Sequence, residues 1–220
     1  MITIALDAMG GDFFPNINIQ GALLALKKFP IKIILIGNKP ILEKEIKKTP
    51  HFPTHKIRII HAEDIIEMTD SPTKAYRKKK NSSIHVGLQL VKEKKAQAFV
   101  SAGNTGAVLT ASTFILGRIE GIERPALLAV MPSEKKPFVM LDMGSNVDCK
   151  PVHLEQFALM GHFFAQLLLG VDRPRVGLLN IGEEDDKGNA LTLAAFPLLK
   201  SLPIHFVGNV EGKHLLDHIA

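Results

Sequence analysis

Short apolar runs separated by polar, glycine-containing segments recur along the whole chain. The runs rich in Ile, Val and Leu predict buried strands; they cover residues 2–6, 31–36, 56–61, 98–100, 126–131, 138–141, 175–180 and 204–207. Longer stretches between most of them carry apolar residues at helical spacing; they predict helices over residues 16–28, 40–48, 73–80, 84–95, 108–116, 153–169 and from 190 onward. Because strands and helices alternate, the pattern predicts an α/β fold whose mostly parallel sheet is covered by helices on both faces.

Two places depart from this regular alternation. The link between the strands at 126–131 and 138–141 is short and turn-like, so these strands are expected to form an antiparallel hairpin. Pro197 falls inside the helix that begins near residue 190. Proline removes a backbone N–H and clashes with the preceding turn, so this helix is expected to stop or kink at Pro197.

Composition indicates an ordinary globular protein. The chain has 220 residues, of which 46% are hydrophobic and 22% are charged, so it has ample material for a core. We expect a single α/β domain over residues 1–220. The one cysteine permits no intrachain disulfide and suggests a reducing compartment. The N-terminal run reaches Asp7 without a basic leader, which favours a strand over a signal peptide, and no apolar run is long enough to span a bilayer.

The chain is basic, with a formal net charge of +5. Its cationic residues are clustered at positions 27–28, 47–48, 77–80 and 94–95. Two interpretations stay open for these clusters, namely solvated helix ends or a surface for an acidic partner. Nucleic acid is the weaker partner, because the absence of Trp and the single Tyr leave few groups for base stacking.

Four of the expected strands end in polar, glycine-containing loops, at residues 7–12, 101–106, 142–150 and 182–189. In open α/β sheets, ligands bind at the carboxyl ends of the strands, so we expect the four loops to converge on one cleft. The loop at 101–106 is a glycine turn between a strand and a helix. The free N–H groups at the start of such a helix suit an anion.

The sequence gives weaker support to two other kinds of site, a cysteine nucleophile and a divalent-ion site. Cys149 stands between Asp148 and Lys150, and a lysine lowers the pKa of a neighbouring thiol; a structural role for Cys149 is nevertheless favoured over a nucleophile. The acidic run at 183–186 suits either a divalent ion, together with Asp142 or Asp148, or an exposed loop before a helix. The loop is favoured, because the first turns of helices favour acidic residues.

The remaining polar groups of the four loops suit phosphate, or the oxyanion that forms on a carbonyl group. Backbone N–H groups, amide side chains and two lysines would hold the anion while it reacts directly, with no covalent enzyme intermediate. We predict catalytic roles for Lys187, Asn104 and Asn189. We predict that substrate or phosphate is bound by Asp7, Gly10, Gly11, Ser101, Gly103, Thr105, Gly106, Asn146, Asp148 and Lys150.

Five motifs, in this order along the chain, resemble the phosphate acyltransferase (PlsX) family of bacterial phospholipid synthesis. They are residues 7–12 (DAMGGD), 101–107 (SAGNTGA), 121–126 (GIERPA), 146–150 (NVDCK) and 179–184 (LNIGEE). The resemblance implies a Rossmann-like three-layer α/β/α fold related to phosphotransacetylases and isocitrate dehydrogenases. It also implies that the acyl group of acyl-acyl carrier protein is joined to inorganic phosphate, which gives acyl phosphate without a metal or organic cofactor.

The resemblance further implies the setting of the protein. We expect an acidic acyl carrier protein as partner, with the 77–80 region as a docking candidate. We also expect a homodimer. The enzyme is expected to be cytoplasmic and to touch the inner membrane face, where a glycerol-phosphate acyltransferase would be a further partner. Ser145 stands where relatives often have alanine. Family members continue beyond the point that matches Ala220, so a C-terminally truncated member is expected. The alternatives are a family member that binds phosphate or a partner without turnover, and an acyl-CoA-dependent enzyme resembling phosphotransacetylase.

Overall fold

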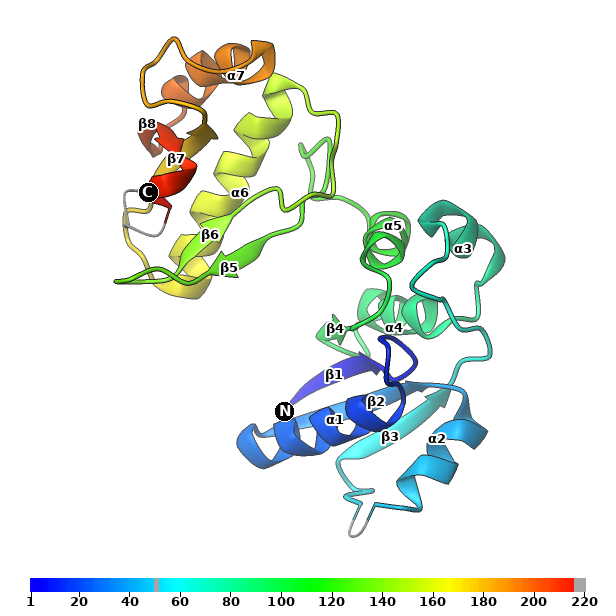
Figure 1. Cartoon of the computed structure of the whole chain (residues 1–220). Coiled ribbons are helices and arrows are strands. Elements are labelled where there is room, and N and C mark those ends of the chain that lie inside the picture. The colour runs from blue at the N-terminus through cyan, green and yellow to red at the C-terminus, as the bar shows by residue number, and fades with distance from the viewer. Residues whose placement is uncertain (50–51, 216–220) are drawn as a thin grey trace. The chain divides into compact units, whose positions relative to one another are not determined.

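The computed structural model describes residues 1–49 and 52–215, and it contains two compact units (Figure 1). Unit 1 comprises Met1–Arg118 and unit 2 comprises Ile119–Ala220. Both units combine strands with covering helices, so the α/β class predicted from the alternating pattern is confirmed. The single domain expected over the whole chain stays a prediction.

The sheet of unit 1 has the strand order β3-β2-β1-β4, and all its strand pairs are parallel. Its strands are β1 Ile2–Asp7, β2 Ile31–Gly37, β3 Ile57–His61 and β4 Ala98–Val100. In the register of β1 with β4, Leu6 is opposite Val100. The carboxyl ends of these two strands therefore lie side by side, and so do the starts of the polar loops that follow them.

Helices cover both faces of the unit 1 sheet. On one face, Ile19 and Leu26 of α1 (Asn16–Lys28) pack on Leu35, together with α2 (Lys39–Ile46). On the other face, Leu90 of α4 (Ser83–Lys92) packs on Ile36. Because alternate β2 residues enter different clusters, both sides of this strand are buried, as its continuous apolar run predicts. Two further helices, α3 (Pro72–Lys78) and α5 (Thr105–Ile115), join α4 in a third apolar cluster.

Unit 2 contains two pairs of strands. The first pair, β5 (Ala129–Met131) and β6 (Phe138–Met140), is antiparallel, so the predicted hairpin is confirmed. The second pair, β7 (Arg175–Asn180) and β8 (His205–Glu211), is parallel. The helices are α6 (Pro151–Leu169) and α7 (Ala190–Ser201), with a short 3₁₀ turn at Gly212–His214.

Several predicted boundaries differ from the structure; for example, the strand expected to begin at residue 126 begins at Ala129, and the strand expected to end at residue 207 continues to Glu211. The helix expected to reach residue 95 ends at Lys92, because the chain turns through Lys94, whose φ of +58° is left-handed. A stop or a kink was expected at Pro197: the stop does not occur, since α7 continues to Ser201, and the kink stays a prediction. Phe196 and Leu199, on either side of the proline, are buried in the unit 2 core, and this packing outweighs the hydrogen bond that proline removes.

Within the described residues, no helix is long and apolar enough to cross a membrane.

Candidate functional site

In unit 1, two of the predicted loops meet around Asp7. Asp7 ends β1 and its side chain is 1% exposed. Its Oδ1 accepts a hydrogen bond from the Met9 N–H at 3.0 Å, and its Oδ2 accepts one from the Ser101 hydroxyl at 2.7 Å. The Gly103 N–H donates in turn to Ser101 Oγ at 3.0 Å. One carboxylate and one hydroxyl thus fix the loop after β1 against the loop after β4.

The two loops approach so closely that side chains are excluded. A Cβ atom on Gly10 would lie 2.5 Å from Asp7 Oδ2 and 2.7 Å from Gly103 N. The next residue, Gly11, has a φ of +94°, a left-handed conformation that favours glycine. Asn18 of α1 secures the turn from outside, because its Nδ2 donates to the carbonyl oxygens of Asp7 and Gly10 at 3.0 and 2.9 Å. The predicted glycines therefore define the shape of the loop.

Asn104 is buried at the start of α5, where it organises the neighbouring chain. Its Oδ1 accepts the Ala107 N–H at 2.9 Å, which caps the helix. Its Nδ2 lies 3.2, 3.0 and 2.9 Å from the carbonyl oxygens of Glu67, Met68 and Asp70. Both the oxygen and the nitrogen of this amide therefore form hydrogen bonds within the protein. This geometry assigns Asn104 a positioning role, and its direct catalytic role stays a prediction.

The first turn of α5 also contains the predicted ligands Thr105 and Gly106. Thr105, the first residue of α5, is exposed. A Cβ atom on Gly106 would lie 2.6 Å from Cγ of Pro72, the first residue of α3. Gly106 therefore allows α3 to pack against α5, and its contact with phosphate stays a prediction.

The basic region at the end of α3 is only partly available to a partner. The Lys79 ammonium donates to the Ile65 carbonyl at 2.7 Å and pairs with Asp70. The hydrogen bond from Lys79, followed by that from the Glu67 amide, holds the pKa of Asp70 below its usual range. Lys79 thus secures the segment that Asn104 also holds. The exposed cations of this surface are Lys74, Arg77, Lys78 and Lys80.

In unit 2, Asp142 closes the loop that follows β6. Its Oδ1 accepts from the Ser145 hydroxyl at 2.6 Å and from the Leu127 N–H at 2.7 Å. Its Oδ2 accepts from the Asn146 N–H at 2.7 Å and from Asn146 Nδ2 at 3.0 Å. Burial on its own would raise the pKa of Asp142, but these hydrogen bonds together hold the pKa below its usual range. The predicted ligand Asn146 is thereby fixed in place.

The remainder of this loop leads to α6. Asp148 and Lys150 are exposed, and Lys150 is the N-cap residue of the helix. Cys149 lies between them, with its Sγ 3.8 Å from the Asn146 carbonyl. Burial, followed by the charge of Asp142, raises the pKa of the Cys149 thiol. The suggestion that a neighbouring lysine lowers this pKa was therefore wrong, and the geometry favours the structural role for Cys149.

The loop before α7 carries Lys187 and Asn189. Asn189 caps α7, because its Oδ1 accepts the Thr192 N–H at 3.0 Å while its own N–H donates to Thr192 Oγ1 at 3.0 Å. Lys187 is exposed, and its carbonyl accepts from Asn180 Nδ2 at 2.9 Å. Asn180 Nδ2 also donates to Oδ1 of the buried Asn209 at 3.0 Å. Sequence reasoning missed this asparagine pair, although each residue lies within or after an apolar strand.

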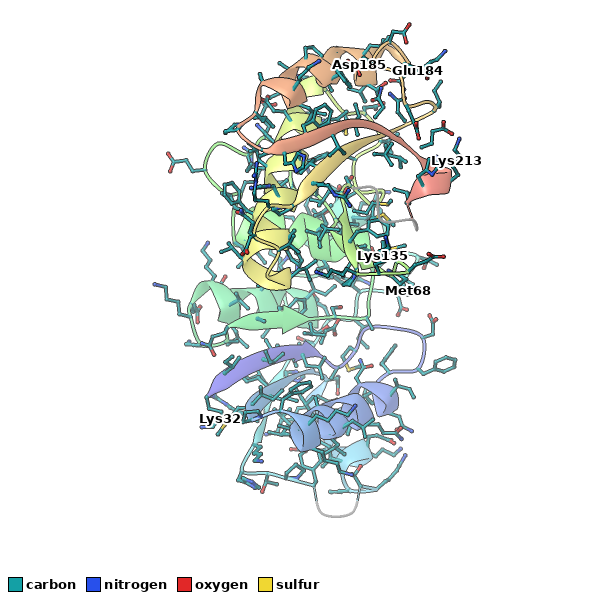
Figure 2. The ribbon with its side chains drawn as sticks, turned by 90° about the vertical axis from the view of Figure 1, so that its left-hand side faces the viewer. Lys32, Met68, Lys135, Glu184, Asp185 and Lys213 are labelled. Carbon is teal, nitrogen blue, oxygen red and sulfur yellow. The ribbon has the colours of Figure 1, made fainter. Side chains whose placement is uncertain are left out.

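The acidic run of the same loop is exposed along its whole length (Figure 2 labels Glu184 and Asp185). Asp185 pairs with Lys200 at 3.5 Å, and Glu183 pairs with His214 at 3.2 Å. Among residues 1–49 and 52–215, no group of three or more His, Cys, Asp or Glu side chains is arranged to hold a metal ion. The exposure of this run and its ion pairs fit the exposed-loop interpretation.

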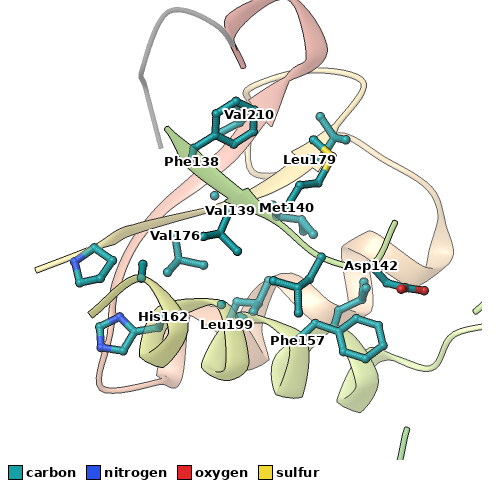
Figure 3. A pocket seen from close by; sticks show the side chains of 18 of the residues that line it. Phe138, Val139, Met140, Asp142, Phe157, His162, Val176, Leu179, Leu199 and Val210 are labelled. Carbon is teal, nitrogen blue, oxygen red and sulfur yellow. The ribbon is translucent and has the colours of Figure 1, made fainter. Parts of the chain in front are cut away.

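Unit 2 also contains a cavity of about 490 Å³ that the sequence did not predict. Figure 3 shows its lining from β6, α6 and β7, with the apolar side chains of Phe138, Phe157 and Val176 among the labelled residues. Asp142 and Asn146 contribute polar groups to it. The lining of this cavity is largely apolar, although Arg173 and Arg175 also line it, and phosphate binding by the polar loops stays a prediction. The single cleft formed by all four loops stays a prediction.

The sequence matches the model of the family described as "Fatty acid synthesis protein" over residues 2–220. It is 50% identical to proteins named "Phosphate acyltransferase" from Pelotomaculum thermopropionicum and Lawsonia intracellularis, over 97% of this chain, and 48% identical to one from Koribacter versatilis over 98%. The chain spans 62% of the length of these curated relatives.

A solved structure shares the fold. It is the crystal structure of a branched-chain phosphotransacylase from Enterococcus faecalis V583, which superimposes with a TM-score of 0.61 at 17% sequence identity. The superposition covers 98% of this chain and 70% of that one. The predicted phosphotransacetylase-like fold class is therefore confirmed.

Proposed function

Because the chain belongs to the family described as "Fatty acid synthesis protein", we propose that it transfers the fatty acyl group of acyl-acyl carrier protein to inorganic phosphate. The product would be acyl phosphate for phospholipid synthesis. The observation that carries this proposal is the match over residues 2–220, which passes through all four polar loops. The curated relatives named "Phosphate acyltransferase" support the acyl transfer, and the loop chemistry supports phosphate as the acceptor.

The proposed reaction is a direct displacement at a thioester. A phosphate oxygen attacks the carbonyl carbon, the new C–O bond forms, and the C–S bond breaks with its electron pair leaving on sulfur. The carrier thiolate then takes up a proton from solvent. Backbone N–H groups would stabilise the oxyanion of the tetrahedral intermediate. No cysteine nucleophile is needed, and the raised pKa of the Cys149 thiol argues against one.

The described contacts refine the roles proposed for individual residues. Lys187, whose side chain is exposed, would supply positive charge to phosphate. Asn104 and Asn189 would act mainly as caps that aim the N–H groups of α5 and α7. Asp7 would shape its loop rather than touch phosphate, because a buried carboxylate repels an anion.

The remaining proposed ligands fall into two kinds. The glycines would allow the close backbone approach that an anion requires; they are Gly10, Gly11, Gly103 and Gly106. The polar side chains would contact substrate or hold the loops; they are Ser101, Thr105, Asn146, Asp148 and Lys150.

The partners belong to the same proposal. An acidic carrier protein would dock on exposed cations of α3 and just beyond its end, namely Lys74, Arg77, Lys78 and Lys80. We also propose a cytoplasmic homodimer that contacts the inner membrane face beside a glycerol-phosphate acyltransferase. The alternative to docking is a solvated helix end. When Arg77 and Lys80 are both replaced by glutamate, docking predicts a higher KM for the carrier substrate, whereas a solvated helix end predicts an unchanged KM.

One assay separates the candidate functions. The 220-residue chain is incubated with inorganic phosphate and either acyl-acyl carrier protein or acyl-CoA, and acyl phosphate is measured. Product from the carrier substrate supports the proposal, whereas product from acyl-CoA alone supports an enzyme resembling phosphotransacetylase. If a longer relative is active and the 220-residue chain yields no product, the proposal is wrong, and the result supports a family member that does not turn over.

A further inference from the structure

The segment at 121–126, one of the five sequence motifs, has no role in the proposed reaction. In the structure it lies against the first turns of α6. The Glu123 N–H donates to Gln156 Oε1 at 2.8 Å, and Gln156 Nε2 donates to the Gly121 carbonyl at 3.0 Å. One glutamine side chain therefore holds two backbone groups of this segment, the Gly121 carbonyl and the Glu123 N–H.

His153 connects the same segment to the loop that ends at Lys150. Its ring is buried, with 3% of the side chain exposed. Its Nδ1 lies 3.0 Å from the Lys150 N–H and accepts from it. A ring nitrogen that accepts carries no proton, so the neutral ring has its proton on Nε2. Nε2 is 3.1 Å from Glu123 Oε2, and the carboxylate accepts this proton's hydrogen bond.

Two further contacts tie the segment to the beginning of that loop. Asn146 Nδ2 donates to the Pro125 carbonyl at 2.9 Å. The Leu127 N–H donates to Asp142 Oδ1 at 2.7 Å. Residues 121–127 thus contact the start of the 142–150 loop directly and its end through His153.

We propose that Glu123 is a positioning residue for phosphate binding, which acts through His153 on the backbone of Lys150. Glu123 fixes the orientation of the imidazole, the imidazole fixes the Lys150 N–H and the start of α6, and the loop thereby keeps a shape that fits an anion. The inference rests on the proposed function, because it takes the 142–150 loop as part of the phosphate site.

A purely stabilising contact between Glu123 and His153 predicts that removing Glu123 lowers the melting temperature and leaves the Lys150 amide and phosphate binding unchanged. The Glu123 side chain is 53% exposed, and exposed pairs contribute little to folding stability. Removing Glu123 should therefore barely change the melting temperature, whereas a positioning role requires a clear change at Lys150 and in phosphate binding. The two roles are separated by measuring the melting temperature, Lys150 exchange and phosphate binding in the same variants.

The test compares Glu123→Ala with Glu123→Gln and with Glu120→Ala, a change at an exposed acid that directly precedes the segment. Inorganic phosphate binding is measured by calorimetry, and the Lys150 amide is followed by hydrogen exchange. Glu123→Ala should weaken phosphate binding about tenfold and speed Lys150 exchange by a similar factor, the equivalent of one hydrogen bond to a charged group. Glu123→Gln should restore both, because its amide oxygen can accept from His153 Nε2. The control should match the wild type.

A further variant tests the route through the imidazole. In His153→Asn the shorter amide can still accept the Lys150 N–H but cannot reach Glu123, so it should resemble Glu123→Ala, and combining the two changes should add nothing. Wild-type Lys150 exchange in Glu123→Ala, or a Glu123→Gln variant as impaired as Glu123→Ala, would overturn the inference. If the wild type binds no phosphate, the phosphate site itself is wrong, while Lys150 exchange still reports on the positioning contact.

Discussion

Asp7 in unit 1 and Asp142 in unit 2 each hold a loop that follows a strand, but they do so through different partners. Each lies where a strand passes into a polar loop, and each accepts a serine hydroxyl and a backbone N–H. Asp7 joins loops that are 94 residues apart, whereas Asp142 bonds mainly to residues three and four positions later. The loop of Asp7 depends on neighbouring strands and glycines, and the loop of Asp142 depends on its own side chains.

This difference indicates where each loop is vulnerable. Around Asp7 the backbones touch, so added volume is the damaging change. Around Asp142 the loop is held by several hydrogen bonds, so removal of charge or of a donor is the damaging change. The predictions below test the two loops accordingly.

The largest effect is expected from Gly10→Ala. Its new Cβ would meet Asp7 Oδ2 and Gly103 N at distances that no ordinary contact allows, so the two loops must separate. We expect a loss of about 1–3 kcal/mol in the free energy of unfolding, measured by urea denaturation followed by circular dichroism. The matched control is Gly21→Ala in α1, where nothing lies within 4 Å of the added Cβ; it should gain up to about 1 kcal/mol. Equal stability of the two variants would contradict the close packing.

Asn104→Ala should come next. It removes the cap of α5 and the donor that holds Glu67, Met68 and Asp70, for a loss of about 2 kcal/mol. Asn104→Asp keeps the capping oxygen and should recover part of this loss. In the acyl-transfer assay, Asn104→Ala and Lys187→Ala should both reduce turnover more than Cys149→Ala does. Full turnover in Asn104→Ala would remove this residue from the site.

The Asp142 loop should show its dependence on charge as a dependence on pH. Because the folded-state pKa of Asp142 lies below its ordinary value of 3.8, the ionised carboxylate stabilises the folded state at all higher pH. That contribution is lost as the pH falls through the folded-state pKa. Asp142→Asn should therefore be less stable than the wild type at neutral pH, by about 1 kcal/mol, and the difference should shrink below pH 4 in acid titrations of the unfolding free energy. A constant difference across that range would contradict the assignment.

The smallest effect is expected at Cys149. Since burial and Asp142 raise the pKa of its thiol, alkylation by iodoacetamide at pH 7 should be slower than for a free cysteine. Cys149→Ala should keep nearly full turnover. If Cys149→Ala alone abolished acyl transfer, the direct displacement by phosphate would be wrong.

Much of the fold was predictable because its signals are local. The apolar runs of β1, β2 and β7 and the short link between β5 and β6 identify these elements without any tertiary information. The end of α7 was not predictable, because the packing of Phe196 and Leu199 extends the helix beyond Pro197. The left-handed turn at Lys94 was equally invisible, since lysine gives no local signal for it.

The candidate site was predictable as a set of loops but not as a set of contacts. The five motifs led to the correct family, as the relatives named "Phosphate acyltransferase" confirm. The sequence did not reveal that the side chain of Asn104 holds distant carbonyl groups, or that Asn180 pairs with Asn209. The link from Glu123 to His153 was also missed, because it spans 30 residues. Such contacts depend on tertiary placement, for which residue type alone carries no signal.

The most direct test of the central claim is whether the polar loops bind phosphate. Amide hydrogen exchange of the 220-residue chain is compared with and without inorganic phosphate, with chloride at equal ionic strength as the control. The account predicts slower exchange in the loops at 101–107 and 142–151, with β2 unchanged. Unaltered exchange in both loops at phosphate concentrations that support acyl transfer would contradict it.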